Sequence, residues 1–449
     1  MTRKLFPKQR GQVSILLAVS MTTLLAVVGL SLSAGLSYMI RAKLNAATDA
    51  ASLAAARATS IGGDQATQTA NAKAAATRFF NANFPATFMG ASATLNEPQI
   101  SFNGGAVTIG VSASATMPTF FMGNLTSGPL APAVLTETKR KDLDMVVALD
   151  VSGSLSGQAA QVRSSAITFL KQFNSQRDRV GLLHFAYGAV IDQEIRPIAR
   201  GFDRTAMETA IGTYSFNGST ASAEGMYAAR EMINRVPEPN LNRSNLRVIV
   251  FFSDGAPNAF ASYLNWNNMF ECNQPGTITT DDDGSGEPGG LMKYDKQNEA
   301  VGGGCTPDQR NVYNLLSKKA TLPVWYNGHN KADQEYKVVT NSPRQVTNAI
   351  NYDNVNRAAR NLVEAMAAKT RGENVFVFTL GLGAALKQVT GTDTEVGEDI
   401  LKCMANSTDA PSRCFNANQP IGVYCHAATQ AELTPCFSKL ASAILRISK

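Results

Sequence analysis

The longest apolar stretch of the chain covers residues 11–40 and contains no charged side chain. A helix of that length spans about 45 Å, which exceeds the hydrocarbon core of a membrane at about 30 Å. A cleaved signal peptide would have an apolar core of only about 7–15 residues. The pattern therefore predicts a retained transmembrane helix over residues 11–40, preceded by a basic segment at residues 1–10.

The charges around this stretch predict its orientation. Basic residues near a membrane span tend to stay in the cytoplasm. We therefore expect a single-pass protein with its N-terminus in the cytoplasm and residues 41–449 outside it. Four basic residues precede the stretch and two follow it: Arg3, Lys4, Lys8, Arg10, Arg41 and Lys43.

Residues 41–140 predict a helical part followed by a β-rich part. The Ala-rich pattern continues the first helix, Gly62 and Gly63 interrupt it, and a second helix extends to about Asn83. Asn-Gly-Gly at 103–105 is a hairpin signal. The alternative is a simple spacer between membrane and C-terminal domain. Short, partly alternating apolar runs that predict strands lie at 91–95, 99–102, 106–115 and 134–138.

From residue 141 onward, buried strands alternate with amphipathic helices. This order predicts an α/β domain over residues 141–449, with a mostly parallel sheet covered by helices on both faces. The strand at 189–195 is expected to be an antiparallel edge. The expected strands are 145–149, 179–185, 189–195, 248–252 and 374–380, and the expected helices are 158–173, 204–213, 221–236, 353–370, 398–405 and 432–447.

The alternation stops between residues 256 and 350, which we interpret as a large insertion. Its acidic segment 279–287 partly resembles a calcium loop. Counted from Asp281, however, the twelfth position is Met292, where an EF-hand needs a bidentate Glu, so a solvated loop is the simpler interpretation. The insertion follows a candidate site loop directly, and this predicts a lid or a partner-contact surface.

Candidate metal-binding residues lie where the first strand of this domain ends. Asp150, Ser152 and Ser154 form Asp-x-Ser-x-Ser on the loop that leaves the strand. In open α/β sheets, ligands bind beyond the carboxyl ends of the strands. A carboxylate with two hydroxyls suits Mg²⁺ better than zinc. Alone, the pattern is equally typical of a helix N-cap with a Ser-rich turn.

Two later stretches favour the metal site. Thr220 lies on a polar, Gly-containing loop before a helix, and Asp254 follows the buried strand at 248–252. In this combination the sequence resembles the von Willebrand factor type A (vWA) domain. The resemblance implies a Rossmann-like fold with a metal-ion-dependent adhesion site, a bound divalent ion (Mg²⁺ foremost, Ca²⁺ or Mn²⁺ as alternatives) and a protein partner whose Asp or Glu completes the coordination. The implied ligands are Asp150, Ser152, Ser154, Thr220 and Asp254.

The N-terminus carries a second resemblance. Arg10-Gly11, the long apolar helix and the Ala-rich segment 45–57 are similar to the N-termini of TadE/TadG-like proteins of Tad-type (Flp) pilus assembly. That family includes members with a C-terminal vWA domain. The resemblance implies a component anchored in the bacterial inner membrane, with a pilin-like region at 41–140. Leu16 stands where processed pilins carry Glu, a departure that argues against cleavage at Gly11.

Six cysteines all lie in the region predicted to be outside the cytoplasm, which favours disulfides over free buried thiols. Cys272 and Cys305 would close the insertion. Residues 413–426 are interpreted as strand, turn and strand, which Cys414 and Cys425 would close. Cys403 and Cys436 would then join the last two helices. Sequence alone leaves fifteen connectivities open.

Composition and motifs narrow the function. The net charge of +6 comes without a basic stripe with interleaved aromatics, so nucleic-acid binding is not predicted. The sequence has no phosphate-binding loop and no nucleophile elbow, and His184 is expected to be a core residue. We expect a non-enzymatic pilus-assembly component that binds proteins through a metal. The alternatives are an adhesin at the cell surface or pilus tip and, more remotely, a metal-dependent hydrolase.

Overall fold

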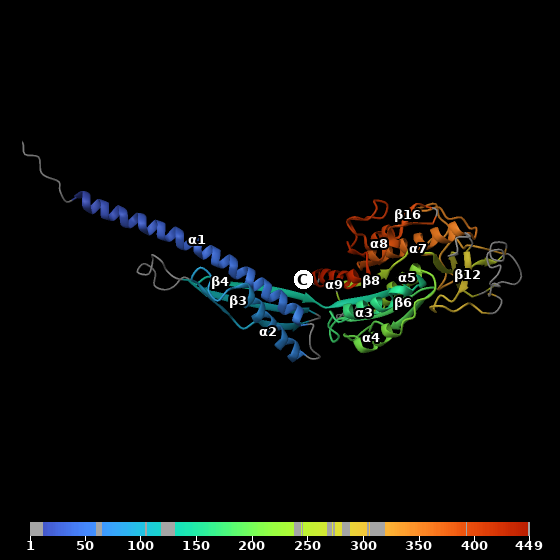
Figure 1. Cartoon of the computed structure of the whole chain (residues 1–449), viewed down its shortest axis with the longest axis horizontal. Coiled ribbons are helices and arrows are strands. Elements are labelled where there is room, and N and C mark those ends of the chain that lie inside the picture. The colour runs from blue at the N-terminus through green and yellow to red at the C-terminus, as the bar shows by residue number, and fades with distance from the viewer. Residues whose placement is uncertain are drawn as a thin grey trace, which may run out of the picture. The chain divides into compact units, whose positions relative to one another are not determined.

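The computed structural model describes residues 12–59, 65–103, 106–117, 131–237, 244, 246–266, 272, 274–280, 288–302, 305, 319–391 and 393–447. The chain divides into two compact units, Met1–Arg140 and Lys141–Lys449. Each unit is described by itself, with the element labels of Figure 1.

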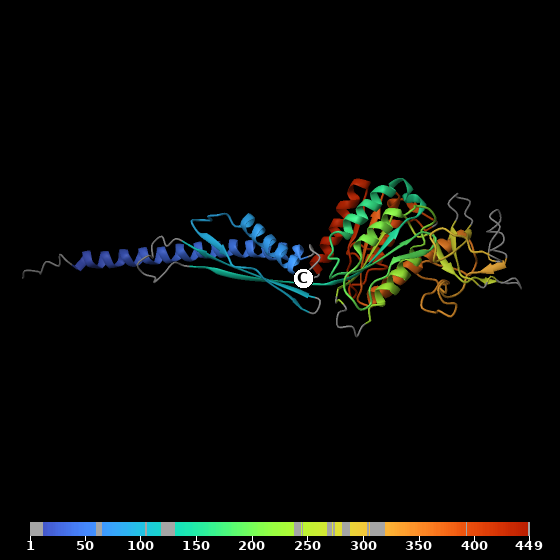
Figure 2. The ribbon, with the colours of Figure 1, turned by 90° about the horizontal axis from the view of Figure 1, so that it is seen from below.

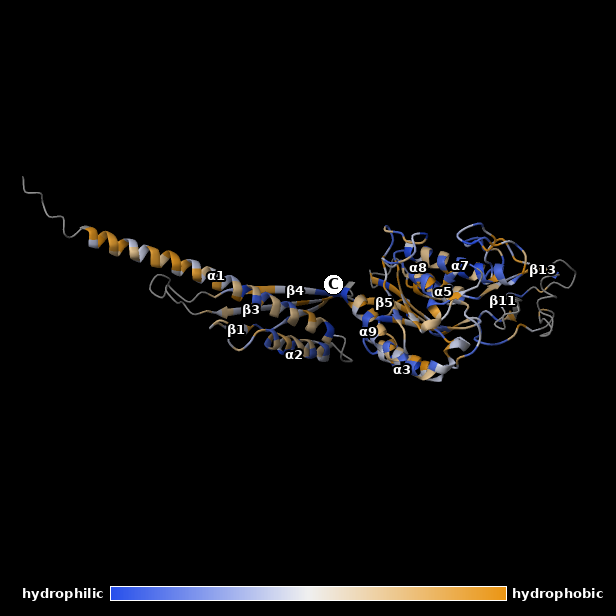
Figure 3. Ribbon diagram, turned by 45° about the horizontal axis from the view of Figure 1, so that its top comes forward, coloured by the Kyte–Doolittle hydropathy of each residue, from blue (hydrophilic) through white to orange (hydrophobic). Residues whose placement is uncertain are grey.

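The first unit is built on one long helix, α1 (Gln12–Ala58). Its N-terminal part displays apolar side chains to the surroundings, with Val13 and Leu16 each 71% exposed, and Figure 3 shows this part as a hydrophobic run. Among the described residues, α1 is the one helix long and apolar enough to cross a membrane. The predicted span thus lies on an apolar helix with an exposed surface.

The second half of α1 packs inside the unit. Ile40, Leu44, Ala47 and Ala51 are fully buried, and their spacing of three and four residues places them on one face. This face packs on the second helix, α2 (Gln65–Asn83), and on an antiparallel sheet. The small alanines allow the close approach.

The sheet of the first unit is centred on one long strand. The hairpin predicted around residues 103–105 joins two strands paired antiparallel, with Asn103 opposite Ala106. The edge strand that leads out of the unit is tied to α1 by a Thr48–Thr136 hydroxyl contact of 3.0 Å. The strands are β1 (Ser92–Leu95), β2 (Gln99–Asn103), the central β3 (Ala106–Thr116) and β4 (Ala133–Lys141).

The second unit contains a six-stranded sheet in the order β17-β14-β8-β5-β6-β7. Every neighbouring pair is parallel except β6 and β7, so the predicted antiparallel edge and the mostly parallel sheet are confirmed. The strands are β5 (Leu143–Asp150), β6 (Arg179–Phe185), β7 (Ala189–Gln193), β8 (Leu246–Ser253), β14 (Phe376–Leu382) and β17 (Tyr424–Ala427).

Helices cover both faces of this sheet, as Figure 2 shows from a second side. Alternate side chains of β5 point to opposite faces of the sheet: Val146 and Ala148 belong to one apolar cluster, and Met145 and Val147 belong to the other. The α/β fold class is confirmed. One face is covered by α5 (Ser222–Asn234), α7 (Tyr352–Gly372) and α8 (Gly397–Ala405), the other by α3 (Ala159–Leu170), α4 (Arg204–Thr213) and α9 (Gln430–Ile447).

Short elements complete the second unit. The helix predicted over 158–173 begins with a 3₁₀ turn and ends earlier, at Leu170. The remaining elements outside the insertion are the 3₁₀ turns η1 (Gly153–Gln158) and η3 (Ala384–Lys387), and the paired strands β15 (Val389–Thr390) and β16 (Glu395–Val396).

The insertion contains two small sheets, and its buried side chains join the core of the domain. Phe260, Ile278 and Tyr326 are fully buried and belong to the same apolar cluster as α5 and α7. The acidic segment at 281–287 lies outside the described residues. The described residues of the insertion therefore extend the domain core, and its role as a lid or partner-contact surface stays a prediction. Its strands are β9 (Ala259–Ser262), β11 (Gly276–Thr280) and β12 (Pro288–Met292) in one sheet, and β10 (Asn265–Trp266) with β13 (Ala320–Thr321) in another.

The structure contains three disulfides, and two of the predicted pairings are wrong. Cys272 bonds to Cys305 as expected, but Cys403 bonds to Cys414, and Cys425 to Cys436. The error came from the strand predicted at residue 413: this segment is a turn after α8, which brings Cys414 back to that helix. Cys425 lies on β17 and meets Cys436 on α9, which packs on that strand.

Candidate metal centre

The site begins at the end of β5, where the strand delivers Asp150 to the carboxyl edge of the sheet. This carboxylate is fully buried. Its Oδ1 accepts a hydrogen bond of 2.8 Å from the backbone N–H of Ser152, and its Oδ2 accepts one of 2.5 Å from the hydroxyl of Ser253. Two neutral donors thus fix the carboxylate in one orientation.

The two serines of the motif connect β5 to the loop after β8. The Ser152 and Ser154 hydroxyl oxygens are 3.1 Å apart, and Ser154 Oγ donates to Asp254 Oδ1 at 2.8 Å. Ser152 and Asp254 are buried, whereas Ser154 is exposed. Four of the predicted ligands therefore form one cluster that opens to solvent at Ser154.

Thr220 reaches the same edge from a third loop. Its backbone N–H donates to the Asn258 side chain at 2.8 Å. The Thr220 hydroxyl oxygen lies beside Gly255, where an added Cβ would be 3.6 Å away. Gly218 adopts a φ of +94°, a left-handed conformation that favours glycine. Its carbonyl accepts a hydrogen bond of 2.9 Å from the Gly153 N–H, which joins this loop to the Asp-x-Ser-x-Ser loop.

The electrostatics of the cluster favour a cation. Burial raises the pKa of Asp150 from its ordinary value of 3.8 to about 6, against the hydrogen bonds that it accepts. Burial and the negative charge of Asp150 raise the pKa of Asp254 to about 7. Two carboxylates that repel each other in a buried site gain most from a positive ion between them.

The residues fit a divalent ion by their chemistry. Two carboxylates and three hydroxyls are a hard oxygen set, typical of Mg²⁺, Mn²⁺ or Ca²⁺. No group of three His, Cys, Asp or Glu side chains suited to a metal occurs in the described part of the chain. A metal here would therefore depend on the hydroxyls of Ser152, Ser154 and Thr220. That the five residues are metal ligands stays a prediction.

Sequence reasoning missed two residues that position the site. Ser253 orients Asp150, and Asn258 holds Thr220 through its N–H. Ser253 directly precedes Asp254, so the Ser-Asp-Gly stretch could have indicated its role. The sequence around Asn258 contains no motif that indicates its role. His184 is buried and hydrogen-bonded to Asp192 at 2.9 Å, which confirms its assignment to the core.

Metal-free protein should lose stability as the pH rises through the raised pKa values. The folded state holds protons on Asp150 and Asp254 up to about pH 6–7, whereas the unfolded chain releases them near 3.8. The stabilising contribution is thus present below pH 4 and lost by about pH 7. In chelator at pH 8, the free energy of unfolding of Asp254→Asn should be higher than that of wild type by roughly 1–3 kcal/mol.

At pH 5 this difference should be clearly smaller than at pH 8, because Asp254 is then protonated in the folded wild-type protein and only the unfolded chain has released its proton. Denaturant unfolding of both proteins at the two pH values provides the measurement. An Asp254→Asn protein that is less stable than wild type at pH 8 in chelator would contradict the electrostatic description.

Two separate segments of the chain match models of known protein families. The model of the von Willebrand factor type A domain matches residues 145–256, and that of the TadE/G-like Flp pilus-assembly family matches residues 11–58. No curated protein matches the chain.

Solved structures with similar folds include two pilus proteins. The pilus adhesin SpaC from Lactobacillus rhamnosus GG is 12% identical, with a TM-score of 0.38, over 80% of this chain and 35% of that chain. The vWF domain of the type V pili tip protein Mfa5 from Porphyromonas gingivalis is 14% identical, with a TM-score of 0.39, over 69% of this chain and 97% of that chain. The chain thus spans about a third of the length of SpaC.

The second unit has a mostly parallel sheet with helices on both faces, and its residues 145–256 match the model of the vWA domain. Residues 11–58, on the long apolar helix, are similar to the TadE/G-like Flp pilus-assembly family.

Proposed function

We propose that this chain is a membrane-anchored component of Tad/Flp-type pilus assembly, whose vWA domain binds a protein partner through a divalent metal ion. The observation that carries the proposal is the meeting of Asp150, Ser154, Thr220 and Asp254 from three loops at one edge of the sheet. We expect no enzymatic activity, since binding explains this arrangement without a general base.

The charge of the site indicates the kind of partner. Asp150 and Asp254 together balance a divalent ion, and the three hydroxyls add no charge. When bound, Mg²⁺ would supply a position open to one further oxygen ligand, because it takes six oxygens and readily keeps water. A carboxylate of the partner suits this position best, since it adds a negative charge to a nearly neutral centre. The partner is therefore expected to present an Asp or Glu.

Affinity capture from solubilised membranes tests the proposal. The full chain should retain its partner in Mg²⁺ and lose it in chelator, and Asp150→Asn should lose it in both conditions. Asp203→Asn is the matched control, because Asp203 caps α4 away from the site and Asn caps a helix equally well. Capture that survives both chelator and Asp150→Asn would refute a metal-dependent mechanism.

Cell fractionation separates the proposal from the surface-adhesin alternative. An anchored assembly component stays with the inner membrane through α1. Recovery of the chain in sheared pili or on the cell surface would favour the adhesin.

The topology gives a further prediction. If residues 41–449 lie outside the cytoplasm, alkaline phosphatase fused after Lys449 should be active, and a reporter that works only in the cytoplasm should be silent. The expectation rests on the four basic residues before the apolar stretch against two after it. A silent phosphatase with an active cytoplasmic reporter would reverse the orientation.

A further inference from the structure

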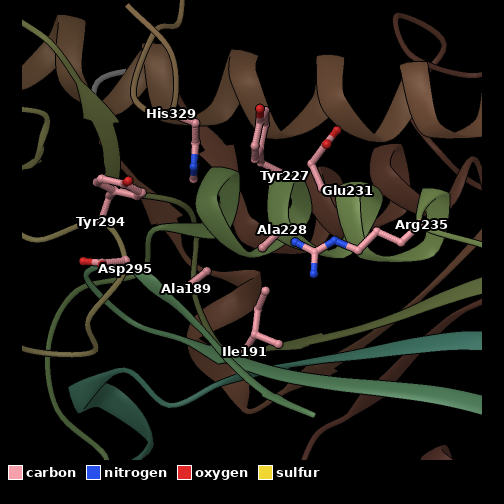
Figure 4. A pocket seen from close by; sticks show the side chains of 9 residues that line it. All are labelled: Ala189, Ile191, Tyr227, Ala228, Glu231, Arg235, Tyr294, Asp295 and His329. Carbon is pink, nitrogen blue, oxygen red and sulfur yellow. The ribbon is translucent and has the colours of Figure 1, made fainter. Parts of the chain in front are cut away.

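A cavity of about 330 Å³ opens beside α5, where the edge strand β7 meets the insertion. Figure 4 shows its lining side chains. Ala189 and Ile191 of β7 and Ala228 of α5 contribute its apolar surface. The volume suits a small molecule or a single long side chain.

Three aromatic rings form one wall of this cavity. The rings of Tyr227 and His329 stack with centroids 4.1 Å apart and planes at 10°, and the ring of Tyr294 meets His329 edge-on at 4.7 Å. His329 Nε2 lies 2.8 Å from a carboxylate oxygen of Glu224, which is fully buried. Because both stacking and this hydrogen bond hold the imidazole, the wall is rigid.

Carboxylates surround the aromatic wall. Glu231 and Asp295 line the cavity and are exposed. The negative potential reaches the tyrosines: burial, followed by Glu231 and other acids, raises the pKa of Tyr227 to about 12, and burial followed by Asp295 raises that of Tyr294. Aromatic faces together with carboxylates are the environment that attracts a cation.

One basic side chain also lines the cavity. Arg235 forms an ion pair with Glu194 of the neighbouring strand segment, so its charge is balanced. Figure 4 shows the Arg235 side chain extending from the side away from His329, with its guanidinium next to Ala228. At the aromatic end, Glu231 lies 3.6 Å from Arg230, but Arg230 forms closer ion pairs with Glu335 and Glu373.

The cavity adjoins the loops of the candidate metal centre. The Tyr294 carbonyl accepts a hydrogen bond of 2.9 Å from Ala189 N–H. Three residues further on, the Gln297 side chain donates to Asn217 Oδ1 at 3.0 Å, on the loop that leads to Thr220. The segment that carries Tyr294 therefore also contacts the loop that leads to Thr220.

We propose that this cavity binds an organic cation, an alkylammonium or guanidinium group held against Tyr227, Tyr294 and His329 with Glu231 and Asp295 as counter-charges. The group could belong to a free small molecule or to a Lys or Arg side chain of a bound protein. The inference goes beyond the proposed function and does not require the metal.

Ligand-observed saturation-transfer NMR on the full chain in detergent tests this inference. The probes are choline, N-acetyl-lysine amide and ethylguanidinium, at constant ionic strength and in chelator, so that failure of the metal centre leaves the result unaffected. At least one cation should bind saturably, and 3,3-dimethylbutan-1-ol, the neutral isostere of choline, should bind at least about fivefold more weakly than choline if choline is that cation. Tighter binding of choline supports a small-molecule ligand, and tighter binding of the lysine or guanidinium probe supports a side chain.

Variants localise the binding. Tyr227→Ala should weaken it at least about fivefold, whereas Tyr227→Phe, which keeps the ring, should retain it. Asp295→Asn should weaken it severalfold, and the side chain is exposed, so the fold should be unaffected. Asp203→Asn, an acid outside the cavity, should change nothing. Wild-type affinity in both Tyr227→Ala and Asp295→Asn, no saturable binding of any cation, or equal binding of the neutral isostere would overturn the proposal.

Discussion

Asp144→Asn is expected to lower the free energy of unfolding of the 141–449 unit by about 3–5 kcal/mol, because it breaks a buried ion pair by removing one partner. The Asp144 and Arg179 side chains are both fully buried, with Arg179 Nε 2.8 Å from Asp144 Oδ1. Arg200 also reaches this carboxylate, at 3.3 Å, and the Ser244 N–H donates to it at 2.9 Å. Asparagine keeps the shape but leaves a buried guanidinium without its counter-charge.

Tryptophan fluorescence during denaturation measures this loss, because both tryptophans of the chain, Trp266 and Trp325, lie in the 141–449 unit. Asp203→Asn again serves as the control and should stay within about 0.5 kcal/mol of wild type, since the cap that Asp203 gives to the Ala206 N–H is kept. A loss below about 1 kcal/mol for Asp144→Asn would show that the Asp144–Arg179 ion pair contributes little to the stability of this unit.

Removal of the Cys272–Cys305 disulfide by a double Ser substitution is expected to cost about 3–4 kcal/mol in the chain-entropy model. The bond closes a sequence separation of 33 residues and is buried in the cluster shared with α5 and α7. Removal of Cys403–Cys414, which closes 11 residues, is the matched comparison. Its loss should cost about 1 kcal/mol less, because loop entropy grows with the logarithm of loop length.

Denaturant unfolding of the two double variants, followed by Trp266 and Trp325, gives both values. Unfolding of the wild-type protein with and without reductant checks that the bonds are formed in the purified chain. A larger loss for the short loop than for the long one would contradict the entropic explanation.

Local pattern was sufficient to predict five of the six strands of the sheet and the helices that cover it. The strand expected at 179–185 and the helix expected at 204–213 have those bounds in the structure, since a strand with an apolar centre and an amphipathic helix with an Asp cap are both specified by the local sequence. The strand expected at 374–380 lies two residues later, because the helix before it extends through Gly372 and a turn follows.

What the sequence did not reveal depends on long-range packing. The partners of Cys403 and Cys436 are decided by how the turn after α8 folds back and by how α9 packs on β17. Tyr227 and His329 are about a hundred positions apart in the chain and meet only because the insertion packs on α5. The candidate metal residues were predictable because each follows a strand or a Gly-containing loop, and the sheet collects such loops at one edge.

Calorimetric titration of Mg²⁺ into the full, chelator-stripped chain in detergent at pH 8 tests the metal centre most directly. We predict one bound ion per chain in wild type and none in Asp150→Asn or Asp254→Asn. Thr220→Val, which loses only a neutral hydroxyl, should weaken binding without abolishing it. No binding to wild type at millimolar Mg²⁺, or binding that Asp150→Asn and Asp254→Asn leave unchanged, would contradict the account.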